Sequence, residues 1–180
     1  MKATGIVRRK DDLGRVVIPK EIRRTMRIRE GDPLEIYTEK DGEVIFKKYS
    51  PVGELADFAS QICDSLHRST DAVAAVCDRD SVIAVSGGGK RELLSKPISP
   101  ELEKLMESRR IYRFEPGTGA MPVVDADGPY SVAVAAPVVS EGDLMGCVLF
   151  AQLKDSRGAG EVEYKLAETV ASFLGKQMES

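Results

Sequence analysis

Short hydrophobic runs separated by polar turns fill the first fifty residues of the chain. The runs have the length of single strands and are rich in β-branched residues, which favour sheets. The pattern predicts four strands, at residues 4–9, 15–18, 34–38 and 43–48. Pro19 cannot donate a hydrogen bond within a sheet and suits the start of a helix, so we expect a short helix over residues 19–27. Asp41-Gly42, between the last two runs, predicts a type I′ hairpin turn.

This N-terminal segment is too short to bury its own hydrophobic residues well. About fifty residues seldom form a stable core without a disulfide or a metal. The residues that need a partner surface are Ile6, Val7, Val16, Val17, Ile18, Leu34, Ile36, Val44, Ile45 and Phe46. We therefore expect residues 1–50 to form an obligate dimer, whose two-fold axis would duplicate every functional side chain.

Helical and strand patterns also divide the rest of the chain, which predicts a second domain over residues 54–180 after a short linker at 51–53. Apolar side chains at helical spacing predict a helix near residues 54–67, namely Leu55, Phe58, Ala59, Ile62 and Leu66. Ser99 followed by Pro100 predicts the start of another helix. A long apolar stripe predicts a final helix over residues 161–178.

Apolar runs joined by short polar turns predict the strands of this second domain, at residues 73–77, 82–85, 131–139 and 144–152. The turns are short enough for neighbouring runs to pair in an antiparallel sheet. Residues 113–129 are rich in glycine and proline and predict a loop that could cover a pocket. The fold class expected for the whole chain is α+β.

Positive charge is concentrated at the N-terminus, although the whole chain carries a net charge of −3. Residues 1–29 contain ten Lys and Arg against three Asp and Glu, whereas residues 54–180 are net negative. Successive helical residues are turned by about 100°, which places four cations on one face of the predicted helix. They are Lys20, Arg23, Arg24 and Arg27. Like charges side by side do not help folding, so we interpret the row as a surface for a polyanion such as nucleic acid.

Several motifs in the first fifty residues resemble the AbrB-type swapped-hairpin DNA-binding domain. They are Thr4-Gly5-Ile6-Val7-Arg8, the run from Asp12 to Pro19, the run from Glu21 to Thr25, and Leu34-Glu35-Ile36-Tyr37. The resemblance implies that two chains interleave their hairpins into one small dimeric β-barrel. It also implies that Arg8, Arg15, Arg23 and Arg24 contact double-stranded promoter DNA, with a preference for AT-rich sequences. Lys20 and Arg27 are added to this set from helical spacing alone.

The order of elements expected for residues 54–180 is similar to that of a GAF domain, an α/β sandwich around an antiparallel sheet that senses small molecules. Together the two domains resemble the stage V sporulation protein T family. That resemblance implies a transcription regulator, both repressor and activator, of sporulation genes, acting in the cytoplasm on the forespore nucleoid. It also implies a homotetramer formed through the helices near 54–67 and 161–178, although both stripes could instead pack on their own sheet. An unidentified small molecule could bind the GAF-like domain, and we expect no cofactor.

The cysteines and the histidine give little support to metal binding or catalysis. Cys63, Cys77 and Cys147 are odd in number and lie among apolar residues, which predicts buried free thiols. His67 is the only histidine, so we expect no Cys/His metal site. The run Ser86-Gly87-Gly88-Gly89-Lys90 lacks residues that a phosphate-binding P-loop requires. No hydrophobic run is long enough to span a membrane and no signal peptide is visible.

Two other functions stay open. Swapped-hairpin domains also occur in antitoxins, but these usually carry a short disordered tail, whereas residues 54–180 have the pattern of a folded domain. Some GAF proteins are enzymes that reduce sulfoxides through cysteines. No nucleophile with a base and an orienting partner is visible here, so we do not expect an enzyme.

Overall fold

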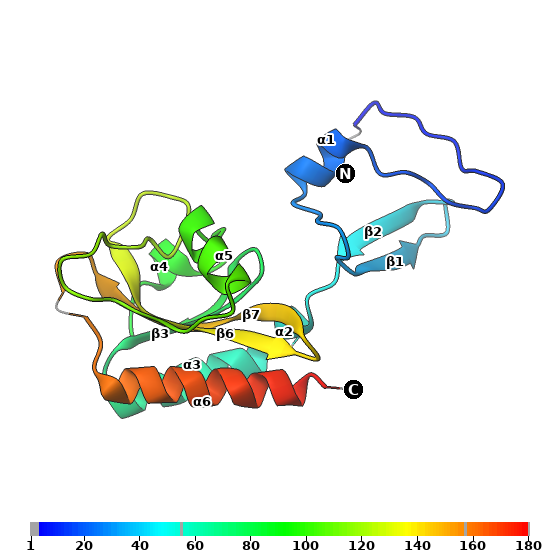
Figure 1. Cartoon of the computed structure of the whole chain (residues 1–180). Helices are drawn as coiled ribbons and strands as arrows, with labels where there is room; N and C mark the ends of the chain where they lie inside the picture. Colours follow the sequence, from blue (N-terminus) through cyan, green and yellow to red (C-terminus); the bar gives the residue numbers. More distant parts are fainter. Residues whose placement is uncertain (1–3, 55, 157, 180) are drawn as a thin grey trace. The chain divides into compact units, whose positions relative to one another are not determined.

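The computed structural model describes residues 4–54, 56–156 and 158–179. The chain divides into two compact units, Met1–Tyr49 and Ser50–Ser180, which we call the head and the body (Figure 1). Each is described by itself.

The head contains one short helix and one hairpin. Its elements are α1 (Lys20–Thr25), β1 (Leu34–Thr38) and β2 (Val44–Lys48). The strands pair antiparallel, with Ile36 opposite Phe46, which confirms the expected hairpin. The expected type I′ turn is wrong, because Gly42 has a φ of 82° whereas Asp41 does not have a positive φ. The turn is closed by the N–H of Gly42, which donates to the carbonyl of Glu39 at 3.1 Å.

Residues 4–9 and 15–18, which we expected to be strands, are not paired in any sheet. A tight turn does join them, since the Asp11 N–H donates to the Arg15 carbonyl at 2.9 Å. The β-strand pattern of these segments is satisfied only by a neighbouring strand, and the single head offers them none. The expected helix is also shorter than 19–27, because Arg27 adopts a φ of 51° that no α-helix continues.

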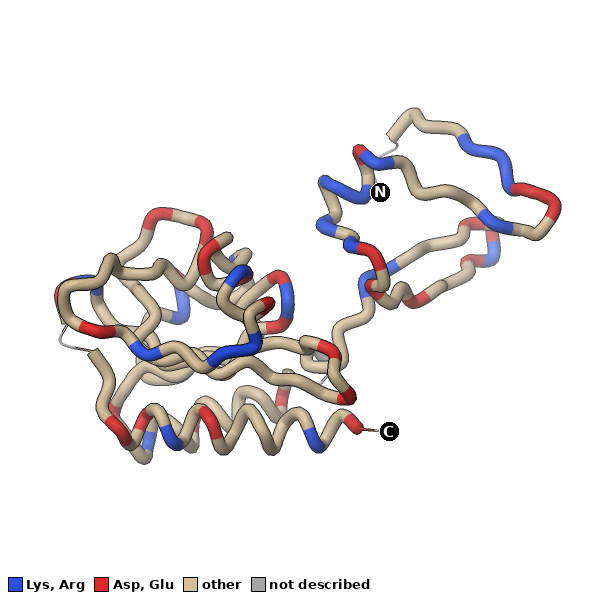
Figure 2. Tube along the Cα trace, viewed as in Figure 1, with Lys and Arg blue, Asp and Glu red and all other residues tan. Residues whose placement is uncertain are grey.

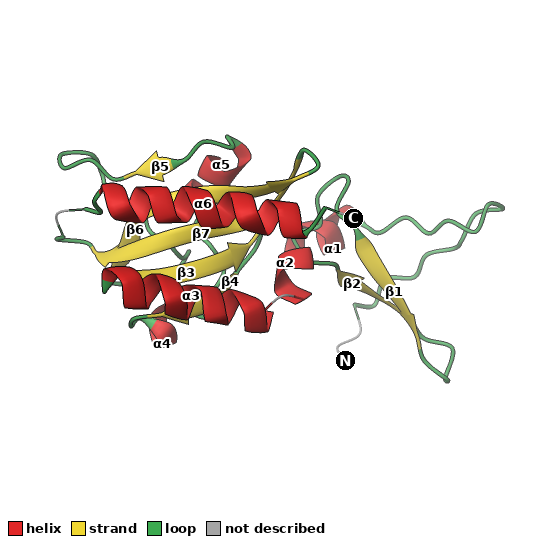
Figure 3. Cartoon of the chain, turned by 90° about the horizontal axis from the view of Figure 1, so that it is seen from below, coloured by secondary structure: helices red, strands yellow, loops and turns green. Residues whose placement is uncertain are grey.

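The body is a five-stranded antiparallel sheet covered on both faces. The strands lie in the order β4 (Val82–Ser86), β3 (Val73–Asp78), β7 (Asp143–Leu153), β6 (Tyr130–Ser140), β5 (Tyr112–Arg113). Two long helices, α3 (Ala56–Thr70) and α6 (Glu161–Gln177), lie side by side on one face (Figures 1 and 3). On the other face are α4 (Lys90–Leu93) and α5 (Pro100–Glu107).

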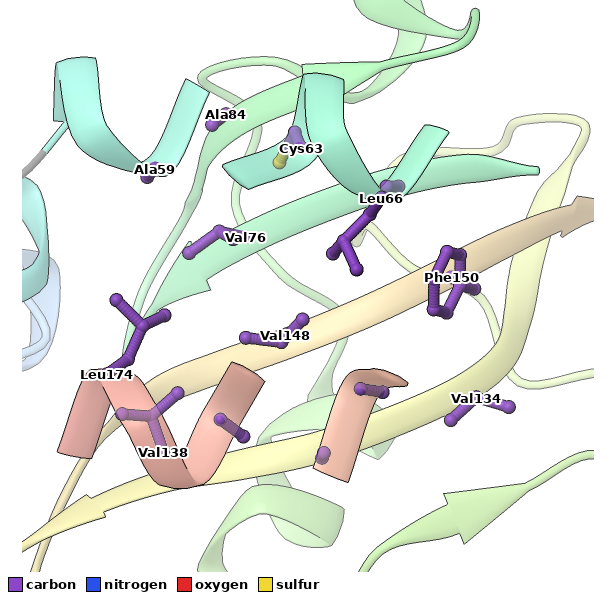
Figure 4. Packing of buried hydrophobic residues seen from close by; sticks show 14 of the residues in the cluster. Ala59, Cys63, Leu66, Val76, Ala84, Val134, Val138, Val148, Phe150 and Leu174 are labelled. Carbon is purple, nitrogen blue, oxygen red and sulfur yellow. The ribbon is translucent and has the colours of Figure 1, made fainter. Parts of the chain in front are cut away.

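Each face of the sheet has its own hydrophobic core. Beneath α3 and α6, Cys63, Leu66 and Leu174 pack on strand residues that include Val148 and Phe150 (Figure 4). On the opposite face, Leu93, Leu102 and Met106 are buried against the other side of the same strands. Helix α5 begins as predicted, because the Ser99 hydroxyl accepts the N–H of Leu102 at 3.0 Å. The body therefore carries enough buried apolar surface to fold by itself.

The connection between the units belongs to the body. Residues 51–53, which we expected to be a linker, lie in α2 (Pro51–Glu54). The side chain of Val52 is only 1% exposed and packs in the core beneath α3 and α6. The hydroxyl of Ser50 donates to Asp78 Oδ2 at 3.1 Å. Leu55, expected on the helix stripe, lies outside the described residues. Strand β5 had no predicted residue range, because two residues carry no periodicity.

Gly175 allows α6 to touch the sheet closely, which gives a testable prediction. A Cβ added at Gly175 would overlap the backbone carbonyl of Val139. We expect Gly175→Ala to lower the free energy of unfolding by about 1–3 kcal/mol, because the helix must move away from β6. Ser172→Ala, at an exposed position of the same helix, is the matched control. Equal denaturant midpoints for the two variants would contradict this close packing.

Candidate nucleic-acid interface

The four arginines expected to contact DNA are all exposed on the head. Arg8 precedes the turn at residues 11–15 and Arg15 ends it, whereas Arg23 and Arg24 lie on α1. Lys20, the first residue of α1, is also exposed. Figure 2 shows the Lys and Arg positions of the head in blue along its trace. The head thus presents a set of cations that solvent, and therefore a polyanion, can reach.

Arg27 does not extend the row of cations on α1. The helix ends at Thr25, so the helical spacing that placed Arg27 with Arg24 does not apply. Its side chain is half-buried, and its carbonyl accepts a hydrogen bond from Lys48 Nζ at 2.8 Å. The expectation that Arg27 shares the helix face is therefore wrong.

Arg15 is held by an acidic side chain that our sequence analysis overlooked. Asp11 Oδ2 accepts from Arg15 Nε at 2.7 Å, and Asp11 Oδ1 accepts from the Arg15 backbone N–H at 2.7 Å. The hydrogen bonds from Arg15 lower the pKa of the Asp11 carboxyl below its ordinary value. The spacing of four residues across a glycine turn was the available signal.

The head leaves most of its large apolar side chains in contact with solvent. Val7 is 85% exposed, Val17 72%, Leu13 71% and Ile36 61%. Among residues 4–49, Pro19 alone is buried. So much exposed apolar surface on a small unit is typical of a protein–protein interface. It agrees with the expectation that a second chain covers this surface.

The body also carries an apolar flank beside its core, on α3 and α6. The rings of Phe58 and Phe173 lie 6.3 Å apart between the two helices. Phe173 is still 46% exposed, and Val162 on the same helix is 60% exposed. Both stripes therefore pack on their own sheet with one side, and α6 leaves apolar atoms accessible on the other.

The three cysteines are buried, as expected. Burial raises the pKa of Cys63 to about 12. The pKa of Cys77 is raised well above its ordinary value, because its thiol is hydrogen-bonded to the Cys147 side chain and is removed from water. A thiol must ionise to act as a nucleophile. Both shifts disfavour the thiolate form of these two cysteines.

The glycine run and the single histidine have structural roles in the body. Gly87 and Gly89 approach the side chains of His67 and Tyr130 so closely that a Cβ would overlap them. His67 Nδ1 lies 2.9 Å from the carbonyl of Ala72. Within the described part of the chain, no three His, Cys, Asp or Glu side chains are grouped to hold a metal ion. A search of the same residues finds no helix with the length and apolar character to cross a membrane.

Comparison with known proteins identifies the family. Residues 54–179 match the model described as stage V sporulation protein T C-terminal, transcription factor. Over 179 residues, 99% of each chain, the protein is 51% identical to stage V sporulation protein T of Bacillus subtilis. The chain belongs to the stage V sporulation protein T family.

The head of this family member has relatives of its own. The chain is 56% identical to transition state regulatory protein AbrB of Bacillus subtilis over 63 residues, which are 32% of this chain and 65% of that protein. Residues 7–54 also match the model described as antidote-toxin recognition MazE, bacterial antitoxin.

The body shares its fold with the type II free methionine-R-sulfoxide reductase of Thermoplasma acidophilum. The two are 10% identical, with 69% of this chain and 93% of that chain covered and a TM-score of 0.51. At this identity the likeness concerns the fold alone. The expected α+β class is confirmed by the helices and antiparallel sheets of the structure, and the AbrB-type head by the identity to AbrB.

The buried thiols of this stage V sporulation protein T family member yield a prediction about reactivity. We expect Cys63, Cys77 and Cys147 not to react with Ellman's reagent in the folded protein at pH 8, because they are inaccessible. The same protein in guanidinium chloride should release three equivalents of the coloured thiolate. The change in absorbance measures both reactions. Rapid reaction of any cysteine before unfolding would contradict this description and favour a thiol enzyme.

Proposed function

We propose that the protein is a transcription regulator of sporulation genes, which represses some promoters and activates others. The observation that carries the proposal is the 51% identity to stage V sporulation protein T over 99% of both chains. The exposed cations of the head support it, because duplex DNA is the polyanion that such a regulator must bind.

In this proposal two heads form an obligate dimer and bind one duplex. Arg8, Arg15, Arg23 and Arg24 of each chain contact phosphates or reach into a groove, since a guanidinium donates along two parallel N–H bonds. Helix α1 has only six residues, so little sequence is read through a long recognition helix. Discrimination then rests largely on DNA shape and deformability, which favours flexible AT-rich promoters.

An antitoxin is the second candidate, favoured by the match of residues 7–54 to an antitoxin model. Antitoxin function would require a toxin-binding segment outside the head. In this chain the residues after the head form a five-stranded sheet with two hydrophobic cores. The regulator is therefore the better proposal. Inaccessible cysteines weigh in the same way against a sulfoxide-reducing enzyme, so we propose that the protein is not an enzyme.

The DNA-binding proposal predicts that the affinity for DNA falls steeply with salt and that specific arginines account for the slope. If eight arginines of a dimer meet phosphates, the slope of log K against log salt approaches about −7, from ~0.9 per contact. We expect Arg15→Ala and Arg23→Ala each to weaken binding and to flatten the slope by about 2, because each removes two contacts from the dimer. Fluorescence anisotropy of an AT-rich duplex at several salt concentrations measures both quantities.

Lys40→Ala is the matched control, because Lys40 is an exposed cation in the turn between β1 and β2. It should leave the slope close to that of the wild type. An unchanged slope for both arginine variants, or an equal change for Lys40→Ala, would reject direct phosphate contacts at these positions.

We further propose that bodies associate through α3 and α6, so that two head dimers join in a tetramer. The exposed apolar atoms of Phe173 and Val162 support this assignment. We expect Phe173→Asp to halve the mass in sedimentation velocity while the head dimer still binds DNA, because a charge cannot be buried there without a partner. Ser172→Asp, on the polar side of α6, should remain tetrameric. A tetramer formed by Phe173→Asp would exclude this surface.

Two finer parts of the proposal concern regulation and location. The GAF-like body would take an unidentified small molecule, with no permanent cofactor, and the ligand would alter the angle between the head dimers. The short connection supports this mechanism, because Ser50 is hydrogen-bonded to Asp78 and Val52 is buried. A sporulation regulator would act in the cytoplasm, on the nucleoid of the forespore.

A further inference from the structure

The turn at residues 11–15 holds an arginine side chain without help from any other part of the protein. Three hydrogen bonds join Asp11 and Arg15 across this turn. The Asp11 N–H donates to the Arg15 carbonyl at 2.9 Å, and both carboxylate oxygens accept from Arg15, one from the backbone N–H and one from Nε. All of these contacts lie within five residues, so they do not depend on a second chain.

The carboxylate occupies only one side of the guanidinium. It contacts Nε, at 2.7 Å, so the donors on the two Nη atoms of Arg15 are not used by Asp11. The Arg15 side chain is 71% exposed although it is paired. The pair therefore presents a guanidinium whose Nε edge is fixed and whose outer end faces solvent.

We propose that Asp11 is a positioning residue that sets the specificity of Arg15 for DNA. The inference deepens the proposed DNA-binding function and rests on it. Asp11 has opposite effects on two kinds of DNA complex: a specific complex, in which the geometry of Arg15 matches the DNA, and a non-specific complex, which is held by charge alone. It fixes an otherwise flexible side chain before binding, which favours the one complex whose geometry matches. It also places a negative charge beside a phosphate-binding cation, which weakens complexes held by charge alone.

These two effects predict that the protein discriminates less well between DNA sequences when the Asp11 carboxylate is removed. Surface ion pairs contribute little to stability, so the head should stay folded. Asn at position 11 has an NH₂ group in place of one acceptor oxygen, so it cannot reproduce the arrangement in which Oδ1 accepts the Arg15 backbone N–H and Oδ2 accepts Nε. The two backbone hydrogen bonds of the turn, Asp11 N–H to Arg15 and Gly14 N–H to Asp11, do not involve the side chain. Asp11→Asn thus releases the guanidinium and keeps the turn.

The experiment measures the affinity of the full chain for an AT-rich promoter duplex and for a GC-rich duplex of equal length, by anisotropy at several salt concentrations. We expect Asp11→Asn to lower the ratio of the two affinities by about threefold to tenfold. Affinity for the GC-rich duplex should be unchanged or higher. Asp11→Ser, which can cap the turn but cannot reach Nε, should behave in the same way.

Asp12→Asn is the control, because it removes the same charge from the neighbouring exposed position. It should raise both affinities together and leave their ratio unchanged. An unchanged ratio in both Asp11 variants, or an equal fall in Asp12→Asn, would overturn the inference. If the wild type shows no salt-dependent binding, the proposed function fails as well, whereas tight binding by Arg15→Ala would reject only the contact of Arg15 with DNA and the inference built on it. The two failures are therefore distinguishable.

Discussion

Burial of apolar surface is divided unequally between the two units of the chain. In the body, one sheet is covered on both faces, and Phe150 and Leu149 of a single strand are buried in opposite cores. In the head, Val7, Val17 and Ile36 remain mostly exposed. Hydrophobic burial is the dominant favourable term in folding, so we propose that the head depends on association for its stability. Segments 4–9 and 15–18 of the head have no strand partner within the single chain.

The segments that we expect to associate with a second chain also carry two of the arginines that we expect to bind DNA. The unpaired segments 4–9 and 15–18 carry Arg8 and Arg15 beside exposed valines. A partner chain that covers the valines would also fix the backbone that carries these arginines. In our proposal the dimer therefore both stabilises the head and doubles the cations that face DNA, whereas the acidic body carries the association surface and the sensor.

Local signals account for most of what the sequence predicted correctly. The hairpin of β1 and β2, the Ser99 cap of α5 and the long helix α6 each follow from residues close in sequence. The errors arose where a longer-range contact decides. Val52 was assigned to a linker because a single valine beside proline and glycine has no periodicity, yet the body buries it. Arg27 was placed on a helix that ends two residues earlier.

The candidate site was predicted in part. Exposure of Arg8, Arg15, Arg23 and Arg24 agrees with the expectation, and their contacts with DNA stay a prediction. The partner of Arg15 was missed, because Asp11 lies on the far side of a turn and no helical or strand period relates the two residues.

The sequence alone determined the two-domain order, the basic N-terminus and the family resemblance, because charge, turn residues and hydrophobic period are local properties of the chain. Only the tertiary structure decided which apolar residues are covered and that the cysteines are inaccessible. Those features depend on which backbone segments meet in space, and no count of residues along the chain contains that information.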